Sequence, residues 1–223
     1  MSHLTLNAPA IVLGAGVGVA AGLYAHRTLR QAAPEGDGDQ GTAVRLPGWL
    51  LALIGGVSGA LIGARFGMQA RLPAYLYLVA IAPALGAVDA TTRKLPNQIL
   101  LPAYPASASL LGFAAWRVGD ATTLWRSILA GTLLYVVFLT VALVAPRGSL
   151  GWGDVKLAGL LGLFAGFLGW KTLWLAMMVA FGTAAAYVVV RQLVRREAKA
   201  SRGQTVPMGP ALLLGTLVAV IAS

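Results

Sequence analysis

Long apolar segments alternate with short polar linkers along the whole chain. Eight apolar runs can be drawn, at about residues 8–25, 47–66, 72–89, 98–116, 124–145, 155–169, 171–190 and 207–222. About 20 apolar residues in a helix cross the ~30 Å hydrocarbon core of a bilayer. The pattern therefore predicts an all-α, polytopic membrane protein with about eight transmembrane helices. The sixth run is short, which is compatible with a tilted helix, a partly re-entrant one, or one that spans only with its flanks.

Composition supports this class and narrows the chemistry. Of 223 residues, 58% are hydrophobic and 11% are charged, against about 25% charged in soluble proteins. The net charge is +10, but Lys and Arg gather in linkers between apolar runs, so we expect no nucleic-acid partner. The absence of cysteine excludes disulfides, thiolate metal sites and a cysteine nucleophile. His3 and His26 are too few for a zinc site.

The distribution of positive charge predicts how the chain is oriented. Twelve Lys and Arg residues lie in odd-numbered linkers and five in even-numbered linkers or helix ends. Loops rich in Lys and Arg stay in the cytoplasm. We therefore expect the odd linkers to be cytoplasmic and both termini external.

Two further patterns concern organisation. Residues 31–44 are polar and Gly-rich, typical of a flexible linker. We expect a two-helix amino-terminal unit, residues 1–69, and a six-helix core, residues 70–223. Glycines recur at every fourth residue in the first two runs, which favours close helix–helix packing; they are Gly14, Gly18, Gly22, Gly55, Gly59 and Gly63.

Two aspartates stand apart from the other acidic residues. Asp89 ends the third run, and Asp154 begins the sixth, so both are expected at the cytoplasmic side at matching depth. The remaining acids lie in hydrophilic stretches or short loops; they are Glu35, Asp37, Asp39, Asp120 and Glu197. An ionisable group at membrane depth costs roughly 2.5–3.5 kcal/mol at a helix centre. Two such carboxylates suggest a catalytic pair that shares a proton.

Each aspartate also has a purely structural interpretation. Asp154 precedes an apolar run, as an N-cap residue does, and a helix N-terminus stabilises its charged form. Asp89 has Arg93 four residues on, a surface ion pair worth a few tenths of a kcal/mol. Each structural interpretation explains one aspartate by itself. Because two isolated carboxylates occur at the same membrane depth, a functional role is favoured for the pair.

The residues around both aspartates carry a family resemblance. Gly151-Trp152-Gly153-Asp154-Val155-Lys156-Leu157 resembles the signature of the GxGD membrane aspartyl proteases. The stretch from Asp89 through Arg93 to a Leu95-Pro96-Asn97 turn is similar to the corresponding element of the type IV prepilin peptidase branch. Pro207-Met208-Gly209-Pro210 resembles that family's carboxy-terminal element. The similarity covers about residues 70–223, in the family's order.

The resemblance implies a peptidase of the bacterial plasma membrane with its active site towards the cytoplasm. Its substrates are expected to be type IV prepilin or pilin-like precursors, cut after a short basic leader that ends in Gly. Asp89 and Asp154 would act as the catalytic pair. Supporting roles fall on Gly151, Gly153, Lys156, Arg93, Pro96, Asn97, Pro207, Gly209 and Pro210. No metal or organic cofactor is required, lipid is the other partner, and the sequence does not indicate an oligomeric state.

One departure from the family pattern concerns a second activity. Many bacterial relatives have a larger amino-terminal cytoplasmic region with paired cysteines, associated with N-methylation of the new amino end. Here the corresponding linker is residues 26–46, and the chain has no cysteine. The sequence therefore favours peptidase activity and leaves methyltransferase activity in doubt.

Two other classes of function remain open at this point. A proton- or cation-coupled transporter could use both aspartates, because carboxylates in broken helices mark many transporters. Against this, both aspartates lie near one face and the two halves show no inverted repeat. A non-catalytic scaffold would use them only as helix caps. Asp→Asn substitution discriminates, since Asn also caps a helix but cannot replace a catalytic carboxylate.

Overall fold

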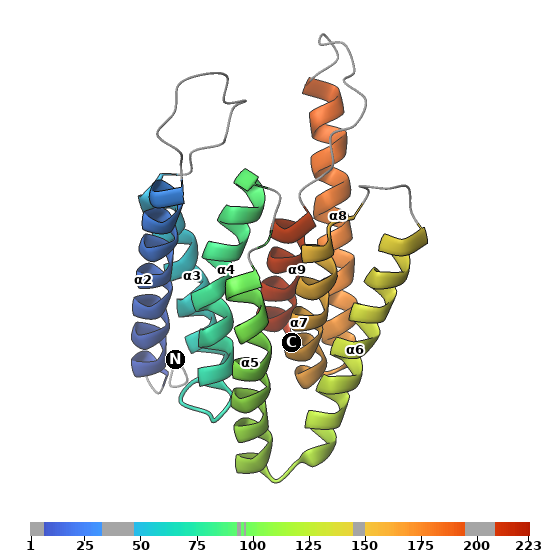
Figure 1. Cartoon of the computed structure of the whole chain (residues 1–223). Helices are drawn as coiled ribbons and strands as arrows, with labels where there is room; N and C mark the ends of the chain where they lie inside the picture. Colours follow the sequence, from blue (N-terminus) through green and yellow to red (C-terminus); the bar gives the residue numbers. More distant parts are fainter. Residues whose placement is uncertain (1–6, 33–46, 93–94, 96, 145–149, 195–207) are drawn as a thin grey trace. The chain divides into compact units, whose positions relative to one another are not determined.

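The computed structural model describes residues 7–32, 47–92, 95, 97–144, 150–194 and 208–223 (Figure 1). Within these ranges the chain is helical, without strands. The helices are α2 (Ala8–Ala32), α3 (Gly48–Phe66), α4 (Leu72–Thr92), α5 (Asn97–Val118), α6 (Ala121–Val144), α7 (Trp152–Leu168), α8 (Trp170–Val194) and α9 (Met208–Ala222). Each corresponds to one predicted apolar run, so the all-α prediction is confirmed.

Six of these helices are long and apolar enough to cross a membrane: α2, α3, α4, α5, α6 and α8. The other two, α7 and α9, have 17 and 15 residues. The short sixth run is therefore a short helix, and twelve of the residues of α7 are buried. A helix so enclosed by protein does not need to match the bilayer thickness along its own length.

The positions of the tryptophans are those expected of helices embedded in a membrane. All six are exposed, and each lies within the first or last five residues of its helix; they are Trp49, Trp116, Trp125, Trp152, Trp170 and Trp174. Tryptophan concentrates where the hydrocarbon core meets the headgroups, because its ring is apolar and its N–H is polar. The helix ends therefore carry the side chains expected at a lipid–water boundary.

The chain divides into two compact units, residues 1–121 with α2 to α5 and residues 122–223 with α6 to α9. This division rests on compactness. The boundary predicted near residue 69 separates a family core from a preceding helix pair, and it stays a prediction.

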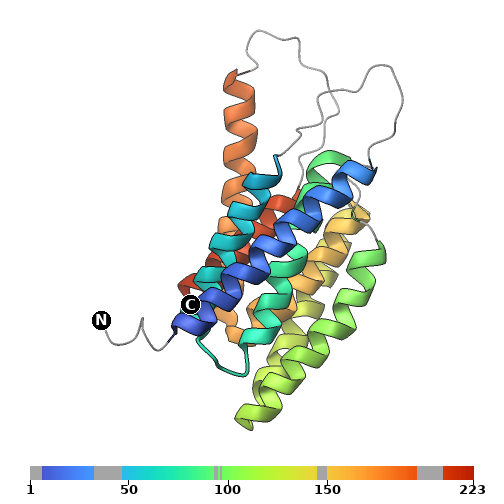
Figure 2. The ribbon, with the colours of Figure 1, turned by 90° about the vertical axis from the view of Figure 1, so that its left-hand side faces the viewer.

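In the first unit, α2 and α3 pack along their glycine faces, as the spacing predicts. A Cβ added at Gly14 would collide with the backbone of Gly59, and one at Gly18 with that of Gly55. The two helices lie side by side in both views (Figures 1 and 2). At the end of α3, Phe66 stacks on Tyr75 of α4 at 4.5 Å between ring centroids.

In the second unit, α9 packs against both α7 and α8. Gly215 of α9 allows this approach, since an added Cβ would lie 2.8 Å from Cβ of Ala180 on α8. In both views α7 and α9 run parallel and begin at the same end of the unit (Figures 1 and 2). The start of α7, with its GxGD sequence, and the start of α9 are thereby brought to one end.

Candidate active site

Asp89 lies in the last turn of α4, which continues to Thr92, three residues beyond the predicted end of the run. Its side chain is only 4% exposed. The turn before it contributes Ala84 and Ala87 to an apolar cluster with Ala25 of α2 and Leu51 of α3. This packing fixes the end of α4 on which Asp89 is placed.

Asp89 is buried near the carboxyl end of α4, a position that is unfavourable for a charged carboxylate. The C-terminus of a helix carries partial negative charge, so a carboxylate there is unfavourable. Burial adds a desolvation cost. The structural interpretation made from sequence is an ion pair between Asp89 and Arg93. Arg93 and Pro96 both lie outside the described residues. Asn97 is the first residue of α5 and is exposed.

Asp154 is not the N-cap of α7, which corrects the structural interpretation made from sequence. The helix begins at Trp152, its N-cap is Gly151 with φ −77° and ψ 143°, and Asp154 is the third helical residue. The backbone N–H of Gly151 donates a hydrogen bond to Oδ2 of Asp154 at 3.3 Å. An acidic residue at this position reaches back to the N-cap amide and stabilises the first turn. Glycine has no side-chain oxygen, so only this half of a capping box can form.

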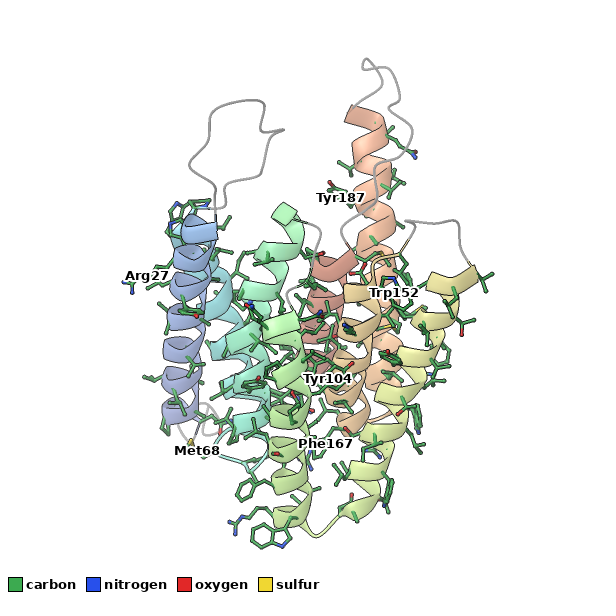
Figure 3. All side chains as sticks on the ribbon, viewed as in Figure 1. Arg27, Met68, Tyr104, Trp152, Phe167 and Tyr187 are labelled. Atoms are coloured by element: carbon green, nitrogen blue, oxygen red, sulfur yellow. The ribbon has the colours of Figure 1, made fainter. Side chains whose placement is uncertain are left out.

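The first turn of α7 holds both a buried carboxylate and an exposed aromatic ring. Asp154 is 9% exposed, whereas Trp152, two residues earlier, is 61% exposed. Gly153 and Lys156 are half-buried in the same turn and the next. Trp152 and Phe167 mark the two ends of α7 in Figure 3. Gly153, Asp154 and Lys156, which the sequence marks as candidate site residues, thus lie at one end of a buried helix.

The carboxy-terminal element lies at the corresponding end of α9. Gly209 is buried and Pro210 is half-buried, both in the first turn of this helix. Proline is tolerated there because the first N–H groups of a helix have no intrahelical partner. Pro207 lies outside the described residues. Gly151, Gly153, Asp154, Lys156, Gly209 and Pro210 therefore belong to the second unit, and Asp89 and Asn97 to the first.

Comparison with known proteins identifies the family. Residues 75–189 match the model of the type IV leader peptidase family. This segment is more than half of the chain and contains both Asp89 and Asp154.

Curated relatives agree with the family match. A prepilin leader peptidase/N-methyltransferase of Stutzerimonas stutzeri is 27% identical over 173 residues, 77% of this chain and 57% of the relative. Proteins of the same name from Escherichia coli (strain K12) and Bacillus subtilis (strain 168) are 30% and 28% identical over 60% and 73% of this chain. The chain spans 56% and 60% of those two relatives. No solved structure matches the chain.

Proposed function

Because the chain belongs to the type IV leader peptidase family, we propose that it is an aspartic endopeptidase that removes the leader of type IV prepilin or pilin-like precursors. The observation that carries the proposal is the burial of two carboxylates at helix ends. Of the three acidic residues in the described ranges, Asp89 and Asp154 are buried and Asp120 is only partly so. A carboxylate held out of water among apolar side chains is costly, so an ionisable residue in such a place is by default a candidate functional residue.

Membrane topology supports pairing these two residues. The chain leaves α4 just after Asp89 and enters α7 just before Asp154, with α5 and α6 between them. Both intervening helices are candidate membrane spans. Two crossings return the chain to the face from which it started. The charge bias of the linkers supports a cytoplasmic location for this face.

The chemistry follows from two carboxylates that share one proton. One carboxylate takes a proton from a water molecule, and the resulting hydroxide attacks the scissile carbonyl, which the protonated partner polarises. Collapse of the tetrahedral intermediate breaks the C–N bond, the amine leaves with the proton that the first carboxylate took from water, and the partner carboxylate ends the cycle protonated again. We assign the first role to Asp154, since the N-terminus of α7 favours a carboxylate, and the second to Asp89 at the C-terminus of α4.

The surroundings of Asp154 suit an extended peptide. Gly151 and Gly153 carry no side chain beside the carboxylate, so a substrate backbone can approach closely. Trp152 is exposed next to them and is suited to anchor the start of α7 among lipid headgroups. A precursor whose basic leader meets its apolar helix at the same boundary would present its cleavage site at this depth.

The decisive experiment compares Asp89→Asn and Asp154→Asn with Asp120→Asn, which makes the same chemical change just before α6. Each variant is co-expressed with a pilin-like precursor from the same genome, and loss of the leader is followed by immunoblot. We expect the first two to lose about 10²–10⁴-fold in cleavage rate while still accumulating in the membrane, and Asp120→Asn to cleave normally. Substantial cleavage by either of the first two would refute the catalytic pair. Ion-dependent flux without any product would favour a transporter instead.

A further inference from the structure

Where α6 packs on α7, it presents small residues, among them Ala130 and Gly131. One stripe of α6 is buried: Ser127, Ala130, Gly131, Leu134 and Phe138. Opposite it, a Cβ added at Gly162 of α7 would lie 2.8 Å from Cα of Gly131. Close contact between glycines gives good packing. The side chain of Leu163 on α7 also packs at Gly131, since a Cβ added there would lie 2.7 Å from its Cδ2.

Three hydrogen bonds add to this packing, all near the carboxyl end of α7. Arg126 of α6 donates from Nε to the carbonyl of Gly166 at 2.9 Å and from Nη2 to that of Phe167 at 2.8 Å. Ser127 donates from Oγ to the carbonyl of Leu163 at 2.6 Å. The carbonyls of Gly166 and Phe167 belong to the last turn, where no helical N–H follows to satisfy them.

The guanidinium is well matched to this position. A cation at a helix C-terminus interacts favourably with the helix dipole. The planar fork of Arg binds two carbonyls in one fixed orientation, which a Lys ammonium cannot do. Arg126 therefore sets both the position and the direction of the end of α7.

The opposite end of α7 carries Asp154. Twelve residues separate Asp154 from Gly166, which corresponds to about 18 Å along a helix. Trp152 and Phe167 show these two ends in Figure 3. Because an α-helix transmits axial displacement along its length, a shift at Gly166 appears at Asp154.

We propose that Arg126, assisted by Ser127, is a positioning residue that fixes the axial register of α7 and thereby the location of the Asp154 carboxylate. The expected effect on cleavage rests on the proposed function. The expected axial shift of α7 does not depend on it. Arg126 thereby has a role other than that of a charge that orients the chain in the membrane.

The main test compares Arg126→Ala and Arg126→Lys with Lys171→Ala. Lys171 is an exposed cation at the start of α8, on the same predicted side, so its loss removes an orienting charge without touching α7. With purified precursor in detergent, Arg126→Ala should lower kcat about 10- to 100-fold while KM changes less than about threefold, because misplacement of about 1 Å costs up to that much. Arg126→Lys should recover part of kcat, and Lys171→Ala should match the parent.

A second readout does not depend on catalysis. The chain has no cysteine, so Trp152→Cys provides a single reporter at the exposed start of α7. Its rate of reaction with a water-soluble maleimide should change by more than about threefold when Arg126→Ala is added, and stay constant when Lys171→Ala is added. If Arg126→Ala fails to accumulate, Ser127→Ala and Arg126→Lys are measured in its place, and each should lower kcat with KM unchanged.

The outcomes separate this inference from the proposed function. An unchanged kcat and an unchanged labelling rate in the Arg126 and Ser127 variants would overturn the positioning role, even if Asp154→Asn is inactive. Equal loss in Lys171→Ala would also overturn it, since charge alone would then explain the effect. Activity retained by Asp154→Asn would instead refute the catalytic pair, and the labelling result would still decide whether Arg126 positions α7.

Discussion

The amide of Gly151 and the carboxylate of Asp154 are joined by a hydrogen bond of 3.3 Å across the first turn of α7. This bond ties the first glycine of the GxGD sequence to the aspartate that ends it. A Cβ added at Gly151 would lie 3.2 Å from Oδ2 of Asp154, tighter than an ordinary contact. A side chain at this position would therefore crowd the carboxylate, whereas φ −77° itself is open to any residue.

Substitution of Gly151 tests this relationship. We expect Gly151→Ala to lower kcat/KM for precursor cleavage about tenfold, or ~1.4 kcal/mol in the barrier, because the added methyl group displaces the carboxylate. Gly182→Ala on α8 is the matched control, since nothing lies within 4 Å of its added Cβ. Cleavage kinetics with purified precursor provide the measurement. Equal activity of the two variants would show that the side chain of Asp154 tolerates the intrusion.

The glycine face between α2 and α3 gives a prediction about stability. A Cβ at Gly18 would collide with the backbone of Gly55, whereas nothing lies within 4 Å of one at Gly16. Gly18→Ala should therefore destabilise the protein by about 1–3 kcal/mol, the range for overpacking. Gly16→Ala should be neutral or stabilising by up to about 1 kcal/mol, because Ala favours helix. Thermal unfolding in detergent measures both, and a lower melting temperature for Gly16→Ala than for Gly18→Ala would contradict the packing.

Membrane topology can be tested with single cysteines in the cysteine-free chain. The charge bias of the linkers predicts that positions 36, 147 and 202 are cytoplasmic and that positions 119 and 223 are external. A membrane-impermeant thiol reagent applied to intact spheroplasts should label only the second group. Opposite accessibility at positions 36 and 147 would contradict the predicted count of crossings, because an odd number of α3, α4, α5 and α6 would then span the membrane.

The new amino terminus of the cleaved product shows whether this chain also acts as an N-methyltransferase. A methyl-donor pocket usually occupies a few hundred Å³ and needs convergent polar groups. The linker of residues 26–46 is poor in apolar anchors and rich in Gly and Asp, a composition that rarely folds into a pocket. We expect a mature pilin with an unmethylated amino terminus when this chain is the only processing enzyme present. Mass spectrometry settles the matter, since a gain of about 14 Da on the first residue that depends on this chain would disprove it.

The sequence by itself determined the class of protein and the helices. Apolar runs separated by charged linkers admit little other than membrane helices, because a bilayer leaves backbone polar groups no partner except the helix itself. The spacing of Gly14, Gly18 and Gly22 likewise determined which face of α2 is packed, since residues four apart share one side of a helix. The two aspartates stood out as candidate site residues because a charge beside an apolar run is costly.

Only the tertiary structure decided how individual side chains are used. The sequence suggests Asp154 as the N-cap of α7, but the N-cap is Gly151, three residues earlier, and Asp154 is the third helical residue. Arg126 reads as one more orienting charge, whereas its guanidinium binds carbonyls 40 and 41 residues away. Helices form from local periodicity, but a hydrogen bond between two helices depends on their packing distance and rotation, which no local pattern contains.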